Sequence, residues 1–232
     1  MWDWNTLEGY VGGISEEVKT KLIQFKDLLK SENQKYNLTT IIDDQEIYLK
    51  HFVDSVLFTK NISLIDQKIL DIGTGAGFPG LIIKILFPNT NIYLVESNNK
   101  KISFLKLVIE TLKLENVFTV NKRAEEYSLE QKEQFDIVIS RAMAPLNILL
   151  EVGVQALKVN GYFICLKSKN VKSEILDLNS KESTIGLKLD KEQKLIINNL
   201  GERINLFYKK FSKTNEIYPR LYSQIKKRPL GK

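Results

Sequence analysis

The sequence contains a single cysteine, a single histidine and no long apolar run. One cysteine cannot form an internal disulfide, and one histidine beside it offers no cluster spaced for a metal ion. No segment reaches membrane-spanning length, and the start, Met1-Trp-Asp-Trp-Asn5, shows no signal-peptide pattern. We therefore expect a cytoplasmic protein without a membrane anchor or a metal site.

The chain has 232 residues, which suits one domain, or one domain with a small attachment. Lysine and arginine number 34, aspartate and glutamate number 28, and the net charge is +6. This modest excess is compatible with an anionic partner such as nucleic acid, but lysine-rich solvated surfaces have the same composition. Charge alone leaves the partner open.

A glycine-rich stretch, Lys68-Ile-Leu-Asp-Ile-Gly-Thr-Gly-Ala-Gly-Phe-Pro-Gly80, organises the rest of the chain. The apolar residues before the glycines predict a short buried strand, and residues 81–87 predict a helix after them. Because glycine has no Cβ, its backbone can take positive φ and a ligand can lie against bare main chain. The stretch predicts a strand, a ligand-binding turn and a helix.

Glu96 lies twenty-three residues after Gly73 and ends a second apolar segment, residues 91–96. In a strand-helix-strand unit, the carboxyl ends of the two strands lie side by side. A carboxylate at that position can accept hydrogen bonds from the two hydroxyls of a ribose. We expect an adenosine-containing ligand between Glu96 and the glycine turn.

The identity of this ligand is a choice between two cofactors. Residues 75–80 also satisfy the G-x-G-x-x-G dinucleotide pattern, so NAD is an alternative. Asp71, just before the turn, suits a cationic amino group and would repel a pyrophosphate. Pro79 removes a backbone N–H from the helix entrance, where a pyrophosphate needs donors. Both residues favour S-adenosylmethionine over NAD.

Three further strands are predicted to alternate with helices, at residues 117–120, 135–139 and 162–166. The carboxyl ends of such strands share one crevice, which would receive Arg123, Arg141 and Lys167. The alternative is that each cation only solvates its own loop. Backbone N–H groups near Ala124 and Glu125 could bind the edge of an adenine ring, unless residues 121–125 form an ordinary charged loop.

Two amphipathic helices are predicted before the first strand, from Ser15 to Glu32 and from Asp43 or Asp44 to about Lys60. Residues 1–60 would then form a helical cap packed against a nucleotide-binding unit at residues 61–232.

His51, in the second of these helices, has two interpretations. It could form a hydrogen bond with Asp54 one turn later, at a contact between the cap and the nucleotide-binding unit. Alternatively, it could lie at the mouth of the substrate site. Neither interpretation makes His51 a catalytic base.

The C-terminal part of the chain has a different pattern. Residues 192–198 and 203–211 predict a hairpin, and such an antiparallel pair would complete a seven-stranded sheet. The tail, residues 217–231, interleaves tyrosines with cations. These side chains could stack on bases and hold phosphates, or the tail could stay solvated.

Missing motifs narrow the class of methyl acceptor. The segment Ser140-Arg-Ala-Met-Ala-Pro145 lacks the Asp/Asn-Pro-Pro-aromatic turn expected for amino-group methylation of adenine or cytosine. Cys165 lies in an apolar predicted strand, which disfavours carbon methylation through a cysteine adduct. An acceptor with a free lone pair fits better. Guanine N7 is such an atom, and because it carries no proton, transfer to it needs alignment and no general base.

A family resemblance runs in order over nearly the whole chain. The segments that carry it are Asn37-Leu-Thr39, His51 with Asp54-Ser55, Asp71 to Gly80, Arg123-Ala-Glu125, Ser140-Arg-Ala142 and Tyr218-Pro-Arg220. They resemble the bacterial small-subunit ribosomal RNA guanine-N7 methyltransferases, the RsmG or glucose-inhibited division protein B family. The resemblance implies an α/β, Rossmann-like class I S-adenosylmethionine-dependent methyltransferase fold. Its seven-stranded, mostly parallel sheet would carry helices on both faces and a small N-terminal helical cap.

The resemblance also implies a reaction, the transfer of methyl from S-adenosylmethionine to N7 of one guanine near the decoding region of 16S rRNA, in free RNA or in the small ribosomal subunit. The implied cofactor contacts are Gly73, Phe78, Ala124, Glu125 and Arg141, to which the turn itself adds Asp71, Gly75 and Glu96. The candidates for the RNA side, none with a catalytic duty, are Asn37, His51, Asp54, Arg123 and Lys167. We expect a monomer. An NAD-dependent oxidoreductase and a non-catalytic RNA-binding assembly factor are the alternatives.

Overall fold

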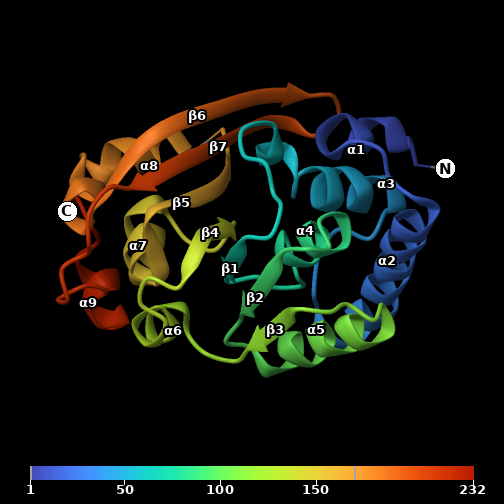
Figure 1. Ribbon diagram of the computed structural model, residues 1–232, viewed down its shortest axis with the longest axis horizontal. Coiled ribbons are helices and arrows are strands. Elements are labelled where there is room, and N and C mark those ends of the chain that lie inside the picture. The colour runs from blue at the N-terminus through green and yellow to red at the C-terminus, as the bar shows by residue number, and fades with distance from the viewer. Residues whose placement is uncertain (1, 170) are drawn as a thin grey trace.

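The computed structural model describes residues 2–169 and 171–232, and within them it shows a seven-stranded sheet (Figure 1). The strands are β1 (Lys68–Ile72), β2 (Asn91–Val95), β3 (Val117–Val120), β4 (Phe135–Arg141), β5 (Leu157–Ser168), β6 (Leu187–Ile197) and β7 (Gly201–Lys210). Their order is β3-β2-β1-β4-β5-β7-β6, and β7 alone runs in the direction opposite to that of the other six strands. The predicted mostly parallel α/β sheet is confirmed.

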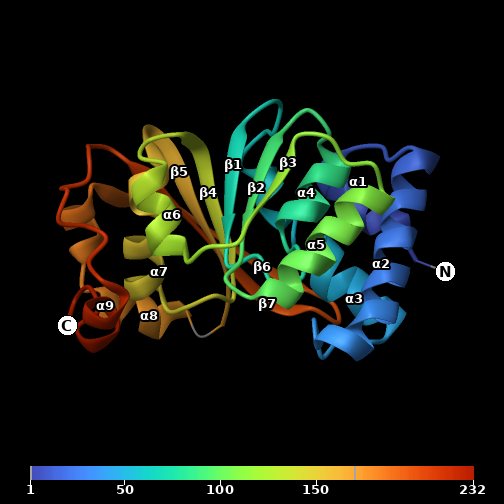
Figure 2. The ribbon, with the colours of Figure 1, turned by 90° about the horizontal axis from the view of Figure 1, so that it is seen from below.

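Helices cover both faces of this sheet. The α-helices are α1 (Trp4–Val11), α2 (Glu16–Tyr36), α3 (Asp44–Ile47), α4 (Gly80–Leu86), α5 (Asn99–Thr111), α6 (Ala124–Glu130), α7 (Leu146–Gly153), α8 (Val171–Leu178) and α9 (Tyr222–Lys227). Figure 2 shows α2, α4 and α5 on one side of the strands and α6, α7 and α9 on the other. None of the helices among the described residues is long and apolar enough to cross a membrane.

Helix α2 begins where the sequence predicts and ends later. The Ser15 hydroxyl accepts a hydrogen bond from the Val18 N–H, which caps the first turn. The helix continues past Glu32 to Tyr36 and ends at Asn37, whose φ of 49° is left-handed. The side-chain oxygen of Asn33 accepts hydrogen bonds from the N–H groups of Leu38 and Thr39, which follow the helix. These bonds stabilise a helix end at Asn37 rather than at Glu32.

The second predicted helix is wrong as a single element. The structure has α3, then a π-helical turn η1 (Tyr48–Val53), and a 3₁₀ turn η2 (Leu57–Lys60). The Ser55 hydroxyl donates to the His51 carbonyl, and the Asp54 N–H bonds the Leu49 carbonyl five residues back. These hydrogen bonds replace the regular i to i−4 pattern of an α-helix. They direct the side chains of His51 and Asp54 toward Arg141 of β4.

The N-terminal helices share a core with the sheet. Leu7, Leu22 and Phe25 are fully buried in one hydrophobic cluster with residues of β1, α4 and α5. The ring of Phe25 stacks on Phe78 of the glycine turn, with centroids 5.3 Å apart. Because the cluster is continuous, the described residues 2–60 share their hydrophobic core with the rest of the described chain.

The predicted hairpin is β6 and β7, and it also contacts the N-terminal helices. The Gln193 side chain on β6 donates to the carbonyl of Leu57 in η2 at 2.9 Å, and Asn205 on β7 donates to Gln193 at 2.8 Å. In Figure 1, β6 arches across the molecule from the C-terminal side toward α1. The hairpin therefore contacts the helical segment that precedes β1.

The C-terminal segment is packed and not a solvated tail. Ile225 of α9 is fully buried, and Arg220 donates to the carboxylate of Glu151 on α7. Of the two alternatives for this segment, the solvated tail is wrong, because a buried carboxylate and an apolar contact hold the segment against α7.

Candidate cofactor and substrate cavities

The glycine turn between β1 and α4 has the backbone that its sequence predicts. Gly73 and Gly77 have φ of 68° and 95°, which other residues rarely adopt. A Cβ on Gly77 would lie 2.3 Å from a methyl carbon of Leu81, and one on Gly73 would lie 2.6 Å from Cγ of Met143. The N–H groups of Gly73 and Thr74 bond the Val95 carbonyl, so the turn is held against the end of β2.

Asp71 lies beneath this turn and is fully buried. Its Oδ2 accepts hydrogen bonds from the Thr74 hydroxyl at 2.6 Å and the Gly80 N–H at 2.8 Å. Its Oδ1 has no hydrogen-bond partner among the described residues. Burial raises the pKa of Asp71 to about 6, because desolvation outweighs these two hydrogen bonds. The carboxylate thus shapes the turn and retains one free acceptor.

Glu96, just after β2, is held by two backbone groups. Its Oε2 accepts the Gly75 N–H at 3.1 Å and its Oε1 accepts the Asn98 N–H at 2.9 Å. The Nζ of Lys101 lies 3.9 Å away. Gly75 therefore acts by orienting Glu96, and the carboxylate keeps further lone pairs for a ligand.

A cavity of about 350 Å³ opens beside these groups, and we call it the glycine-turn cavity. It is lined by Gly73, Val95, Glu96, Ser97, Lys101, Lys122, Arg123, Ala124, Glu125, Ala142, Met143 and Tyr222. The predicted cofactor residues Gly73, Glu96, Ala124 and Glu125 are brought together here. Asp71, Gly75 and Phe78 do not line it, and they support the turn from behind.

The first turn of α6 faces this cavity. Ala124 and Glu125 are its first two residues, and Arg123 before them provides no side-chain cap. Their N–H groups are therefore among those that a helix leaves without an internal partner. Arg123 forms an ion pair with Glu125, and its guanidinium lies 4.1 Å from the ring centroid of Tyr222. Arg123 was predicted on the RNA side, but the structure places it in the wall of the glycine-turn cavity.

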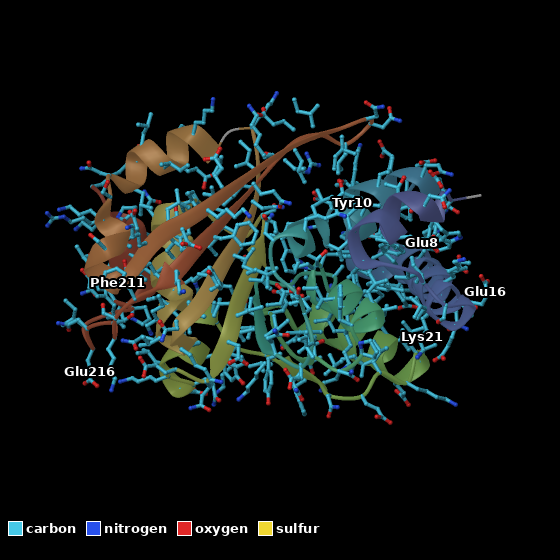
Figure 3. The ribbon with its side chains drawn as sticks, turned by 45° about the horizontal axis from the view of Figure 1, so that its top comes forward. Glu8, Tyr10, Glu16, Lys21, Phe211 and Glu216 are labelled. Carbon is cyan, nitrogen blue, oxygen red and sulfur yellow. The ribbon has the colours of Figure 1, made fainter. Side chains whose placement is uncertain are left out.

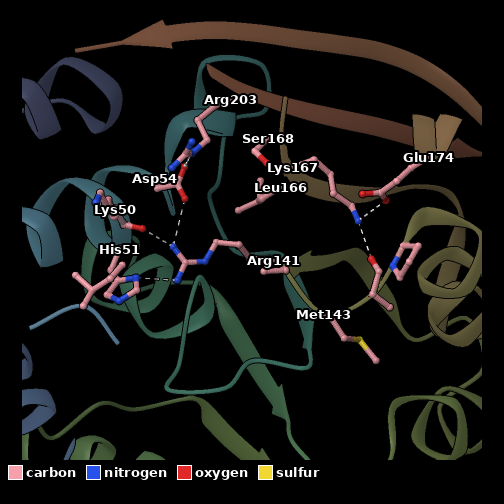
Figure 4. A pocket seen from close by; sticks show the side chains of 14 residues that line it. Lys50, His51, Asp54, Arg141, Met143, Leu166, Lys167, Ser168, Glu174 and Arg203 are labelled. Carbon is pink, nitrogen blue, oxygen red and sulfur yellow. Dashed lines mark hydrogen bonds and ion pairs between the residues drawn. The ribbon is translucent and has the colours of Figure 1, made fainter. Parts of the chain in front are cut away.

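A larger cavity of about 720 Å³ lies next to the first, and we call it the Arg141 cavity (Figure 4). It is lined by Ile41, Lys50, His51, Asp54, Arg141, Ala142, Met143, Ala144, Pro145, Leu166, Lys167, Ser168, Glu174 and Arg203. The predicted residues His51, Asp54 and Lys167 meet here. Arg141, predicted beside the cofactor, projects into this cavity instead.

Arg141 is the centre of a buried polar network. It donates to the Lys50 carbonyl at 2.8 Å, to Nδ1 of His51 at 3.0 Å and to Oδ2 of Asp54 at 3.4 Å. Oδ1 of the same carboxylate accepts Nε of Arg203 at 2.7 Å. Burial lowers the pKa of Arg141, and Asp54 opposes that shift, so the guanidinium stays charged.

The predicted hydrogen bond between His51 and Asp54 is wrong. Nε2 of His51 instead bonds the Thr39 hydroxyl at 2.9 Å, and Nδ1 accepts from Arg141. The π-helical turn moves Asp54 away from the i+3 geometry of an α-helix and toward the two arginines. Burial, and then the charge of Arg141, lower the pKa of His51 to about 3, so the imidazole is neutral.

The remaining candidates differ in their placement. Lys167 lines the Arg141 cavity, where it donates to Glu174 and to the Ala144 carbonyl, both at 2.7 Å. Asn37 is exposed, ends α2 and lines neither cavity. Phe78 is 4% exposed and stacks within the core.

Ala142 and Met143 line both cavities and so form their shared wall. Ala142 has a φ of 54°, which turns the chain sharply after β4. Sequence reasoning missed Met143 together with Tyr222, Arg203 and Glu174. Of these, only Tyr222 had a visible signal, because tyrosines alternate with cations in that segment.

Comparison with known sequences identifies the family. The family model described as "GidB: rRNA small subunit methyltransferase G" matches residues 18–207. The Ribosomal RNA small subunit methyltransferase G of Mycoplasma capricolum is 54% identical over 226 residues, covering 97% of each chain. The protein of the same name from Clostridium kluyveri is 39% identical over 219 residues, covering 93% of this chain and 92% of its own.

Comparison with solved structures supports the same fold. The M. jannaschii TYW2 structure in complex with AdoMet has a TM-score of 0.56 at 17% identity and covers 74% of this chain and 80% of its own. A SAM dependent methyltransferase from Aquifex aeolicus has a TM-score of 0.53 at 15% identity, covering 77% and 97%. The predicted class I methyltransferase fold is thereby confirmed. With the sequence matches spanning nearly its whole length, the chain belongs to the rRNA small subunit methyltransferase G family.

Proposed function

We propose that this protein transfers a methyl group from S-adenosylmethionine to N7 of a guanine in 16S rRNA, near the decoding region. Family membership supports the reaction class and the RNA substrate. The observation that carries the mechanism is the shared wall of Ala142 and Met143, which sets a cofactor-sized cavity directly beside a larger cationic one. An rRNA substrate would also place the activity in the cytoplasm.

The residues around the glycine-turn cavity fit S-adenosylmethionine. The oriented carboxylate of Glu96 can accept both ribose hydroxyls, and the N–H groups that begin α6 can bind the adenine edge. The unpartnered Oδ1 of Asp71 lies under the turn, where a carboxylate favours a cationic ligand over a pyrophosphate. When bound, the cofactor supplies an electrophilic methyl group.

The Arg141 cavity fits a guanine presented from RNA. Enzymes that act on a base take it out of the stack and enclose it in a pocket. Cationic side chains from four elements surround this one, namely Lys50, Arg141, Lys167 and Arg203. Such charges attract the phosphate backbone around a target nucleotide. Three of these cations are paired: Arg141 and Arg203 with Asp54, and Lys167 with Glu174.

The chemistry of this site suits an acceptor that has no proton to lose. Both nitrogens of His51 are engaged and its pKa is lowered to about 3, so it is a poor general base. Cys165 is fully buried, which raises its pKa to about 12 and removes it as a nucleophile. The work left to the chain is alignment of the acceptor and exclusion of water.

Transfer of labelled methyl from S-adenosylmethionine to unmodified ribosomal RNA and small subunits tests this proposal. We expect label at N7 of a single guanine in 16S rRNA. Label absent from every RNA form, while the cofactor still binds, would reject the proposed acceptor and favour a non-catalytic RNA-binding role. Binding of NAD in place of S-adenosylmethionine would favour the oxidoreductase alternative.

Arg141 provides a variant for the same assay. Arg141→Ala removes a charge from the cavity and a partner from His51, so we expect at least a hundredfold loss of methyl transfer. Arg228→Ala is the control, because Arg228 is exposed and lines neither cavity. Equal turnover in wild type and Arg141→Ala would remove Arg141 from the site.

A further inference from the structure

The C-terminal segment returns to the glycine-turn cavity. Tyr222, the first residue of α9, lines that cavity although it lies beyond residues 18–207, the part of the chain that matches the family model. Most of its wall neighbours lie at or just after the carboxyl ends of β1, β2, β3 and β4. A residue from the end of the sequence thus joins a site built from its middle.

Tyr222 makes a direct contact within this wall. The guanidinium of Arg123 lies 4.1 Å from the centroid of its ring, a distance typical of a cation–π pair. The same guanidinium pairs with Glu125, in the first turn of α6. Tyr222, Arg123 and Glu125 therefore form a continuous surface beside the N–H groups proposed to bind adenine.

The chain is fixed on both sides of Tyr222. Before it, Glu151 is fully buried and accepts three hydrogen bonds from Arg220, from the backbone N–H at 3.0 Å and from the guanidinium at 2.8 and 2.6 Å. After it, the side chain of Ile225 is fully buried and the Leu230 N–H bonds the Asn147 carbonyl at 3.2 Å. Bidentate pairing of arginine with a buried carboxylate fixes geometry strongly.

We propose that Tyr222 is a cofactor-binding residue that completes the adenosine end of the glycine-turn cavity, and that the Glu151–Arg220 pair is the positioning contact that holds it there. This inference rests on the proposed function for the identity of the ligand. Tyrosine suits the task because its ring offers a large, rigid contact surface at low entropic cost. Arg123 contacts both Tyr222 and Glu125 and so holds their side chains at the edge of the cavity.

Calorimetric titration of the full chain with S-adenosylhomocysteine, in the absence of RNA, tests the proposal. Tyr222→Ala should weaken binding about tenfold, the scale expected for loss of one aromatic contact. Tyr222→Phe keeps the ring and should bind within about twofold of wild type. Leu221→Ala is the matched control, because Leu221 is the preceding residue and is 71% exposed.

A second set of measurements separates binding from folding. Thermal unfolding without ligand should give Tyr222→Ala, Tyr222→Phe and Leu221→Ala similar midpoints. In methyl transfer, Tyr222→Ala should raise KM for S-adenosylmethionine and leave kcat within about twofold. If Tyr222→Ala unfolds at a lower temperature than wild type, Tyr222→Leu is the second variant, because it keeps a large side chain in the cavity wall. Tyr222→Leu should still bind the ligand several-fold more weakly than Tyr222→Phe.

Glu151→Gln tests the positioning contact. It removes the charge that holds Arg220, so it should weaken ligand binding although Glu151 does not line the cavity. Affinity equal to wild type in Tyr222→Ala and Tyr222→Leu would overturn the inference. That result would not affect the proposal that the protein methylates rRNA. Conversely, a wild-type protein that binds the ligand but does not methylate RNA would reject only the proposed acceptor.

Discussion

The imidazole of His51 stacks on the ring of Phe78, with centroids 4.4 Å apart and planes 15° apart. The guanidinium of Arg141 lies over the same ring at 5.1 Å and donates to Nδ1 of His51. Because Nδ1 accepts, the proton of the neutral ring is on Nε2, which donates to the Thr39 hydroxyl. One aromatic residue of the glycine turn therefore sets the position of two polar side chains in the Arg141 cavity.

This arrangement predicts a pH dependence of stability. The pKa of His51 is lowered to about 3 in the folded state, against an ordinary value of 6.5. Between these values the unfolded chain binds the proton and the folded one does not, so the free energy of unfolding should fall as pH falls from about 6.5 toward 3. Denaturant unfolding at several pH values should show a steeper acid loss for wild type than for His51→Gln. Parallel profiles would contradict a neutral His51.

Asp71 predicts the opposite dependence. Its pKa is raised to about 6 from 3.8, so the folded state binds more protons in that window and the contribution of Asp71 to stability falls as pH rises through 6. Asp71→Asn should therefore raise the free energy of unfolding at pH 7.5 by up to about 3 kcal/mol, with the gain vanishing near pH 4. It should also weaken S-adenosylmethionine binding tenfold or more, because the negative charge under the turn is lost. Unchanged affinity would show that this charge plays no part in cofactor binding.

Gly73→Ala should abolish measurable cofactor binding. A Cβ there meets the Met143 side chain and is strained by the positive φ, so the shared wall must move. Gly9→Ala is the control, because a Cβ on Gly9 meets nothing within 4 Å and the residue lies inside α1. We expect that control to gain about 0.5–1 kcal/mol of stability and to bind cofactor normally. Calorimetry and thermal unfolding give both results.

The strands and the glycine turn could be predicted because short-range patterns fix them. Apolar segments, glycines with positive φ and a capping serine each determine the backbone conformation of residues close to them in the sequence. The side-chain partners of His51 could not be predicted. Thr39 lies twelve residues away and Arg141 ninety, and the π-helical turn that decides between them has no clear sequence signature.

The same distinction applies to the cavities. Glu96 follows its strand directly and was assigned from spacing alone. Tyr222, by contrast, reaches the cavity through long-range contacts of its segment, such as that of Arg220 with a carboxylate 69 residues earlier. Long-range pairs of this kind depend on the packed fold, so a periodicity argument does not detect them. For Arg141, the predicted edge of the sheet is correct, but the side chain enters the Arg141 cavity and not the glycine-turn cavity. Strand order determines the edge, whereas side-chain packing determines which cavity the side chain enters.

Lysine variants can test whether RNA lies over the Arg141 cavity. Lys50 and Lys21 each form an i,i+4 ion pair with a glutamate, but only Lys50 lines that cavity. Figure 3 labels Lys21 on α2, at the end of the molecule away from Phe211 and Glu216. Lys50→Ala should weaken rRNA binding and reduce the slope of log K against log salt by about 1. Lys21→Ala should leave the slope unchanged; equal effects would place the RNA elsewhere.

The hairpin of β6 and β7 limits how this protein can be rebuilt. Gln193 reaches Leu57, and the N-terminal helices share their core with the sheet through Phe25 and Phe78. Exchanging residues 1–60 with those of a relative would therefore mismatch contacts at both the hairpin and the glycine turn. A chain cut once between residues 61 and 67 should instead stay together as two tightly associated fragments. We therefore expect the N-terminal helices to fold only together with the sheet and the hairpin that they contact.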